Sequence, residues 1–244
     1  MKLLRYGPAG AEKPGLLDSA GLLRDLSDHV ADITGDVLDD ASLARLGEID
    51  PASLPIVEGE QRIAPCVGNI GKFLCIGLNY SDHAAETGAA IPEHPILFFK
   101  ANSAIVGAYD DVVMPRGSTK TDWEAKLTGQ WTKGKSCDTF GPTGPWLVTR
   151  DEVGDPQNLS MSCDVNGKRM QTGNTKTMIF SVAEIIEHLS SLMTLHPGDV
   201  ITTGTPPGVG LGIKPEPVFL KVGDTMDLTI EGLGHQRQTV GQDA

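Results

Sequence analysis

A single segment of this 244-residue chain has the apolar spacing of a long helix, and that limits the folds open to the rest. Within residues 181–193, apolar side chains recur every three or four positions and form one face. These side chains are Val182, Ile185, Ile186, Leu189, Leu192 and Met193. Ser181 and Glu184 form a capping box at the start, and Pro197 and Gly198 follow the end. Because 29 glycines and 16 prolines punctuate the chain, we expect mainly turns and strands elsewhere. The predicted class is therefore α+β and β-rich, with one main helix.

The other apolar runs are typical of strands. We expect strands at residues 1–7, 72–80, 95–100, 110–115 and 199–204, with closing strands in 218–240. One hairpin is predicted in residues 13–27, and a second in 159–171, where Asn166-Gly167 is the strongest short hairpin signal. Short helices are expected in residues 40–49 and after Ser81, whose hydroxyl can cap the second of them.

A stretch rich in proline and glycine suggests how the chain is divided. We interpret residues 49–68 as a linker. Residues 1–68 would then form a small N-terminal module, and residues 69–244 the larger, catalytic domain. The length of the chain suits one large domain with such an appendage.

The charge balance narrows the class of partner. Twenty basic and 32 acidic residues give a net charge of −12, which makes nucleic acid and anionic membrane surfaces poor partners. The net charge does not exclude a small anionic substrate, because basic groups near the site decide whether such a substrate binds. The chain has no run near the roughly 20 apolar residues of a membrane span, and its four cysteines form no CxxC pair. We expect a cytoplasmic protein.

His83 and Glu86 are the first candidate site. They lie three residues apart on a predicted short helix, so they share a face. A carboxylate beside an imidazole orients the ring and raises its basicity, which suits activation of a water molecule. A solvated helix face is the alternative interpretation of the same spacing.

A second candidate is a pair of carboxylates in "TDWEAKL". Alternate residues of a strand point the same way, so Asp122 and Glu124 could both offer oxygen atoms to Mg²⁺ or Mn²⁺. Lys126 would follow on the same side, where it could pair with Glu124 and would oppose a nearby cation. Carboxylates at this spacing are also common by chance.

Two further stretches could bind an anion. Lys133 and Lys135 flank Gly134 and would alternate on an extended segment, from which a lysine could stabilise an enolate or a carboxylate. The glycine-rich "TTGTPPGVGLG" follows a predicted strand but lacks the spacing of a phosphate-binding loop. Its backbone N–H groups and the Thr205 hydroxyl could still hold a carboxylate. Ordinary loops are the alternative for both.

Taken in order, five blocks of the sequence resemble the signature of the fumarylacetoacetate hydrolase family. The blocks are "GLNYSDHAAETG", "PRGSTKTDWE", "WTKGKSCDTFGPTGPWLVT", "DVNGKRMQTGNTKTMIF" and "PGDVITTGTPPGVGLG". Nearly the whole chain takes part in the similarity. Its N-terminal module and "IEGLGHQRQ" look most like bacterial ureidoglycolate lyase or 2-hydroxyhepta-2,4-diene-1,7-dioate isomerase-type members.

The resemblance implies a fold and a chemistry. It implies a mixed β-roll, assembled as a homodimer, that cleaves or isomerises a small oxo- or hydroxy-acid. A Mg²⁺ or Mn²⁺ ion, with Glu124 among its ligands, would chelate the substrate. His83 and Glu86 would activate water or move a proton, and Lys135 would stabilise negative charge. Thr205 and Tyr80 would contact the substrate.

One departure from the family pattern concerns the metal. The family has two glutamates in a "WExEL" strand and a later aspartate, whereas this chain has Glu124 followed by Lys126. A segment near 127–128 that would carry two strands and the aspartate is missing. Because one carboxylate cannot hold Mg²⁺ firmly, we expect weakened metal binding and impaired activity. Asp122 could restore part of the site. A non-catalytic family remnant or partner subunit is the alternative, and a nucleotide-binding module is a more distant one.

Overall fold

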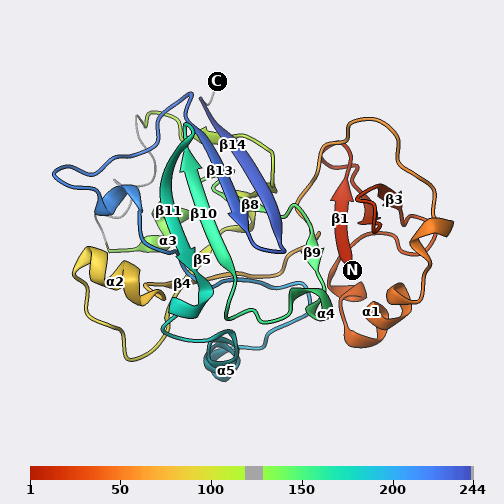
Figure 1. Cartoon of the computed structure of the whole chain (residues 1–244), viewed down its shortest axis with the longest axis horizontal. Helices are drawn as coiled ribbons and strands as arrows, with labels where there is room; N and C mark the ends of the chain where they lie inside the picture. The colour runs from red at the N-terminus through yellow and green to blue at the C-terminus, as the bar shows by residue number, and fades with distance from the viewer. Residues whose placement is uncertain (119–128, 243–244) are drawn as a thin grey trace.

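The computed structural model describes residues 1–118 and 129–242. Figure 1 shows the N-terminal strands and α1, in red and orange, beside a larger body that contains most of the strands. The N-terminal elements are β1 (Lys2–Tyr6), β2 (Lys13–Leu17), β3 (Leu23–Asp25), α1 (Asp40–Gly47) and two 3-10 turns, η1 (Gly35–Val37) and η2 (Pro51–Ser53). The α+β, strand-rich class predicted from the sequence is confirmed.

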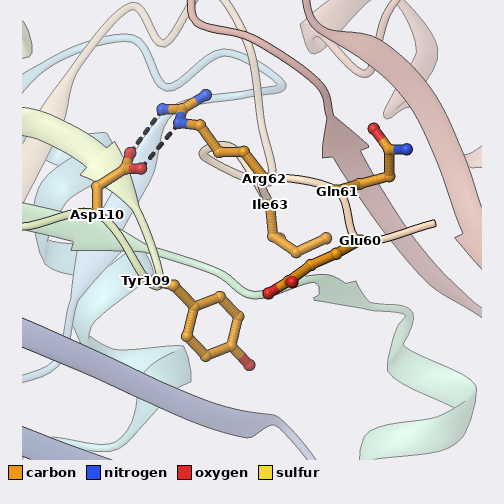
Figure 2. A pocket seen from close by; sticks show the side chains of 6 residues that line it. All are labelled: Glu60, Gln61, Arg62, Ile63, Tyr109 and Asp110. Carbon is orange, nitrogen blue, oxygen red and sulfur yellow. Dashed lines mark hydrogen bonds and ion pairs between the residues drawn. The ribbon is translucent and has the colours of Figure 1, made fainter.

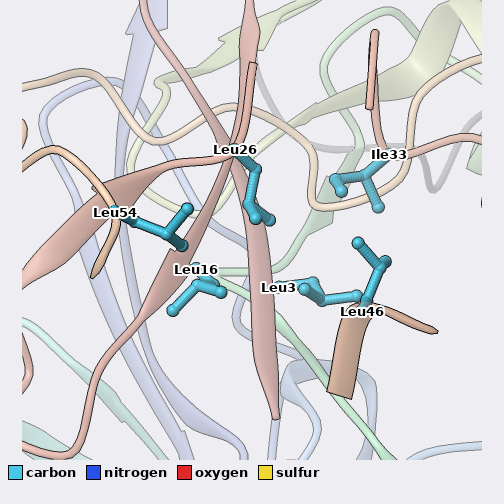
Figure 3. Close-up of a cluster of buried hydrophobic side chains, with 6 residues drawn as sticks. All are labelled: Leu3, Leu16, Leu26, Ile33, Leu46 and Leu54. Atoms are coloured by element: carbon cyan, nitrogen blue, oxygen red, sulfur yellow. The ribbon is translucent and has the colours of Figure 1, made fainter. Parts of the chain in front are cut away.

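The N-terminal part has a sheet and a hydrophobic cluster. Its strands are ordered β3-β2-β1-β9, and the short β9 (Leu147–Val148) comes from the larger body. Six buried side chains from the sheet, α1 and the intervening loops pack together (Figure 3): Leu3, Leu16, Leu26, Ile33, Leu46 and Leu54. The hairpin predicted in residues 13–27 is confirmed by the antiparallel pairing of β2 and β3. At its turn, Asp18 accepts hydrogen bonds from the backbone N–H groups of Ala20 and Leu22, each at 2.9 Å.

The segment predicted as a linker lies along this sheet. Ile56 bridges to Arg24, and Ile63 bridges to Tyr6, both in antiparallel pairing. The stretch between 49 and 68 is therefore tied to the N-terminal sheet at two points. The domain boundary at residue 68 stays a prediction.

A five-stranded sheet dominates the larger body. Its order is β11 (Lys168–Asn174), β10 (Ser160–Val165), β13 (Thr225–Ile230), β14 (Gly234–Gln242) and β7 (Val112–Met114). The hairpin between β10 and β11 is confirmed, and its two turn residues, Asn166 and Gly167, have φ angles of 52° and 73°. Residues 218–224, predicted as part of a closing strand, lie outside any strand.

A three-stranded sheet supports the candidate site. Its order is β12 (Val200–Thr202), β4 (Phe73–Gly77) and β5 (Ile96–Lys100). Helix α5 (Val182–Leu192) packs on one face through a cluster that includes Leu74, Ile76, Leu97, Ile185 and Leu189. Since side chains alternate along a strand, the neighbouring residues point to the other face.

The main helix is confirmed, but its apolar face is narrower than predicted. Ser181 and Glu184 form the predicted capping box. Ile185 and Leu189 are buried, whereas Ile186 is 46% exposed and Leu192 is 59% exposed. Three strands cover only part of the helix circumference, so these two apolar side chains remain in solvent.

The remaining elements are α2 (Ser81–Thr87), η3 (Asn102–Ala104), β6 (Ile105–Gly107), α3 (Trp131–Lys135), β8 (Gly141–Thr143), α4 (Arg150–Val153), η5 (Thr175–Thr177) and η6 (Gly210–Gly212). They include two strands, β6 and β8, that pair in parallel as a small sheet of their own. The helix α2 exists as expected, but Tyr80 rather than Ser81 is its N-cap residue, and the Ser81 hydroxyl donates to the Thr177 carbonyl at 3.2 Å. Within the described ranges, every helix lacks the length and apolar character needed to cross a membrane.

Candidate active site

His83 and Glu86 lie on one face of α2, as the sequence predicts. Nδ1 of His83 is 3.1 Å from Oε2 of Glu86, and the two side chains are 11% and 24% exposed. A carboxylate oxygen only accepts hydrogen bonds, so Nδ1 carries the proton. In the neutral ring, Nε2 is then the basic nitrogen, and it is the one that could take a proton from water or substrate.

The glycine-rich loop holds this pair from the other side. The backbone N–H of Gly208 donates to Oε1 of Glu86 at 2.8 Å. Gly208 has a φ angle of +100°, and a Cβ there would lie 1.9 Å from the Met170 carbonyl oxygen. Only glycine fits so close to β11. Because this position has no side chain, the loop can come near enough to bind Glu86.

A strained backbone position joins the sheet to α2. Leu78 follows β4 with a φ angle of +49°, which L-residues rarely adopt. The next residue, Asn79, is fully buried, and its amide binds Phe180 and Thr203 through their backbone groups at 2.8–3.1 Å. These bonds fix the turn that carries His83 into place.

The floor of the pocket is the face of the three-stranded sheet opposite α5. Thr202, Cys75 and Phe98 lie side by side on β12, β4 and β5, and Gly77 and Lys100 follow at alternate positions. Burial raises the pKa of the Cys75 thiol. The floor therefore combines small residues with one aromatic ring and one lysine.

Helix α3 forms one wall of the pocket, and its presence shows that one prediction was wrong. Lys133 and Lys135 were predicted on an extended segment, but both lie in this short helix. Lys135 lines the pocket, together with Trp131 one turn earlier, whereas Lys133 is not among the lining residues. The Trp131 ring lies against Gly77, and its centroid is 5.5 Å from that of Phe98 in an edge-on arrangement.

Thr205 lines the same pocket from the glycine-rich loop. The side-chain amide of Gln171 donates to Oγ1 of Thr205 at 2.9 Å and to the Pro206 carbonyl at 2.8 Å. The Thr205 hydroxyl itself donates a longer bond, at 3.4 Å, to the Pro206 carbonyl. Gln171 was not predicted from the sequence, because the two residues are 34 positions apart and nothing local links them.

Tyr80 is placed beneath the loop, not among the pocket-lining residues. It is 1% exposed, its ring packs under Gly204, and burial raises the pKa of its hydroxyl. Its predicted contact with substrate stays a prediction.

The pocket has a volume of about 600 Å³. His83, Lys135 and Thr205 line it, together with Lys100, which the sequence analysis did not identify. Lys100 could have been found from strand alternation, since it shares a face with Phe98. The apolar part of the lining includes Phe98, Trp131, Leu211, Val218, Phe219 and Leu220.

The described part of this site does not fit a divalent metal. Hard cations such as Mg²⁺ and Mn²⁺ prefer carboxylate oxygens, and the described lining residues include neither Asp nor Glu. Across residues 1–118 and 129–242, no group of three or more His, Cys, Asp or Glu could hold a metal ion. The predicted ligand Glu124, with Asp122 and Lys126, lies outside the described residues.

A second pocket lies at the junction with the N-terminal part (Figure 2) and is lined by Glu60, Gln61, Arg62, Ile63, Tyr109 and Asp110. Arg62 forms a two-pronged ion pair with Asp110, at 2.8 and 2.5 Å, and a longer one with Glu12 at 3.5 Å. The guanidinium is therefore already neutralised. The Arg62–Asp110 ion pair links the N-terminal part to the larger body. In its lining residues this pocket does not resemble the site around His83.

Comparisons with known proteins agree with this geometry. The family described as fumarylacetoacetate (FAA) hydrolase C-terminal matches residues 72–129 and 126–241. A protein of Burkholderia orbicola (strain MC0-3), named as a hydrolase with no stated substrate, is 55% identical over 276 aligned positions, covering 98% of each chain.

Two solved structures have the same fold over 100% of both chains. One is a fumarylacetoacetate hydrolase from Exiguobacterium antarcticum, at 31% identity and a TM-score of 0.82. The other is a maleylpyruvate hydrolase from Sphingobium sp. SYK-6 in complex with manganese(II) and pyruvate, at 24% identity and a TM-score of 0.78. From the family match and the 55% identity we conclude that the chain belongs to the fumarylacetoacetate hydrolase family.

Proposed function

We propose that this chain binds a small oxo-acid in the pocket beside His83 and cleaves or isomerises it, with activity reduced by weak metal binding. The observation that carries the proposal is the arrangement of the pocket itself. A hydrogen-bonded His83–Glu86 pair, the Lys135 ammonium and the Thr205 hydroxyl all belong to one site. Ureidoglycolate lyase-like chemistry is one specific form of this proposal.

Each group would have a distinct role. Thr205, oriented by Gln171, would donate to the substrate carboxylate. Lys135 would stabilise negative charge as it develops on the oxygen atom next to the breaking or shifting bond. Nε2 of His83 would take a proton from water or from a substrate carbon, while Glu86 keeps the other ring nitrogen protonated.

The proposed weak metal binding has two supports. The maleylpyruvate hydrolase neighbour holds manganese(II), so divalent metal is used within this fold family. In this chain, the alignment with the Burkholderia protein spans 276 positions against 244 residues, and the family match is split at residues 126–129. Both observations suit a missing segment near 127–128, where the sequence analysis expects two of three ligands to be lost.

Binding of pyruvate, followed by calorimetry, tests the substrate site. We expect Lys135→Ala to weaken binding at least tenfold and Lys133→Ala, its neighbour outside the pocket, to leave binding unchanged. His83→Ala should retain binding but lose any turnover. Equal effects of the two lysine substitutions would contradict the proposal.

A metal titration separates a weak enzyme from the alternative, a non-catalytic remnant or partner subunit. Mn²⁺ or Mg²⁺ at millimolar concentration should raise the melting temperature, and Glu124→Ala should abolish the shift. A melting temperature that does not respond to either metal would favour the alternative. We also propose a homodimer, which sedimentation equilibrium would test.

A further inference from the structure

We infer that the pocket selects oxo-acids with an apolar tail, aromatic or branched, over those that end in a second carboxylate. The inference rests on the proposed function for the oxo-acid end of the ligand and adds what the rest of the ligand must be. Four features carry it: the aromatic rings beside Lys135, the apolar wall at residues 218–220, the volume of the pocket and the positions of the cations.

Helix α3 places an aromatic ring next to the lysine. Trp131 and Lys135 both line the pocket and are four residues apart, so they are neighbours on one helix face. Phe98, on the floor, meets the Trp131 ring edge-on at 5.5 Å. A carboxylate or enolate held at Lys135 therefore has its adjoining carbon atoms beside two aromatic rings.

A second apolar wall comes from the segment 218–220. Its first residue, Val218, donates its backbone N–H to the Gly210 carbonyl at 2.9 Å, which fixes the segment beside the glycine-rich loop. Val218 is 56% exposed and Leu211 is 39% exposed, yet both line the pocket. An apolar tail would remove this surface from water, and that is favourable.

The pocket is large for a three-carbon acid. At about 600 Å³ it falls within the range of about 300–1,000 Å³ that is typical of sites for drug-sized ligands. Pyruvate would leave most of the apolar lining in contact with water, whereas a branched or aromatic tail would fill it.

A second carboxylate would lack a comparable partner among the described lining residues. Lys135 is assigned to the reacting end, and His83 is bonded to Glu86. The remaining cation, Lys100, donates to the Phe140 carbonyl and lies over the Phe73 ring, 5.4 Å from its centroid. It is therefore already engaged in holding the strands together, and the described lining offers a second carboxylate no equivalent replacement for its lost hydration.

Calorimetric titration with four acids tests the inference: phenylpyruvate, 4-methyl-2-oxopentanoate, pyruvate and 2-oxoglutarate. We expect the first two to bind at least tenfold more tightly than the last two. Val218→Asn should weaken phenylpyruvate binding severalfold more than it weakens pyruvate binding. Val222→Asn is the matched control, because Val222 lies two residues after this segment, is 48% exposed and is not among the lining residues, and it should change the binding of neither acid.

The outcomes separate this inference from the proposed function. If pyruvate binds but 2-oxoglutarate binds as tightly as phenylpyruvate, the selectivity is overturned and the oxo-acid site stands. Equal effects of the two valine substitutions would also overturn it. If none of the four acids binds, the proposed function fails, and the inference fails with it.

Discussion

Gly208 joins the glycine-rich loop to the His83–Glu86 pair, and replacing it with alanine tests how this pair is held. Its N–H donates to Glu86 at 2.8 Å, and an added Cβ would lie 1.9 Å from the Met170 carbonyl oxygen. A clash with backbone on a paired strand cannot be relieved by turning a side chain. The loop must move away from β11, and the hydrogen bond to Glu86 would be lost.

The expected cost has two parts. An alanine at a φ angle of +100° is strained by about 1–3 kcal/mol, and a lost hydrogen bond to a charged group costs about 1.5–3 kcal/mol. Gly223→Ala is the matched control, because Gly223 has a φ angle of +89° with no atom within 4 Å of an added Cβ. It should suffer the strain alone, so Gly208→Ala should be the more destabilising by about 1.5–3 kcal/mol.

Urea denaturation gives the free energy of unfolding of both variants, and pyruvate calorimetry shows whether the site survives. Gly208→Ala should lose binding while Gly223→Ala keeps it. Equal losses of stability in the two variants would refute the close approach to β11. If Gly208→Ala does not fold, Glu86→Gln tests the other bond of this carboxylate: an amide oxygen can still accept from Gly208, but the NH₂ group cannot accept from Nδ1–H of His83. That variant should fold normally and lose turnover.

Three other predictions follow from burial and charge. Leu189→Ala should reduce the free energy of unfolding by about 2–5 kcal/mol in urea titrations, because Leu189 is fully buried, whereas Ile186→Ala, at a half-exposed position, should cost under about 1 kcal/mol. The hydrogen bond from the Leu22 N–H lowers the pKa of Asp18. The stability that this carboxylate contributes is therefore present above its unfolded pKa and is lost as the pH falls through its folded pKa. In an acid titration, the stability of Asp18→Asn should depend less on pH than that of the unsubstituted chain. Burial raises the pKa of Cys66 to about 11, so iodoacetamide at pH 8 should label it slowly until urea unfolds the chain.

The elements that the sequence predicts well are those with local signals. The capping box of Ser181 and Glu184 and the Asn166-Gly167 turn each depend on residues within a few positions, and both are confirmed. The exposure of Ile186 could not be predicted in the same way. Periodicity gives the width of an apolar stripe, whereas the three-stranded sheet decides how much of that stripe is covered.

Helix α3 shows a local preference overridden by tertiary contacts. Lys133 and Lys135 were predicted on an extended segment, and Gly134 between them disfavours a helix. In the structure, two hydroxyl groups at this helix accept hydrogen bonds from β5 and the residue that follows it: Thr132 from Phe99 N–H at 3.4 Å and Ser136 from Ala101 N–H at 2.9 Å. The helix thus satisfies the edge of a strand 33–35 residues away in sequence, and no local pattern contains that information.

In the candidate site, too, contacts between residues close in sequence are predictable and those between distant residues are not. The shared face of His83 and Glu86 is predictable because the two residues are one helical turn apart. The support of Thr205 by Gln171, and that of Trp131 by Phe98, each join residues more than 30 positions apart. Sequence reasoning could therefore identify groups able to do chemistry and a partner one helical turn away, but not the residues that support them from distant parts of the chain.

The position of α3 explains how an oxo-acid site and a metal site could be affected separately. The family match is split at residues 126–129, directly before this helix. Lys135 nevertheless lines the pocket, because the helix is fastened to β5 by the Thr132 and Ser136 bonds and by the contact of Trp131 with Phe98. The helix that carries this lysine is thus held by the three-stranded sheet. We therefore expect a change in the sequence before the helix to affect the predicted ligand Glu124 first, and to leave the proposed anion-binding side of the pocket in place.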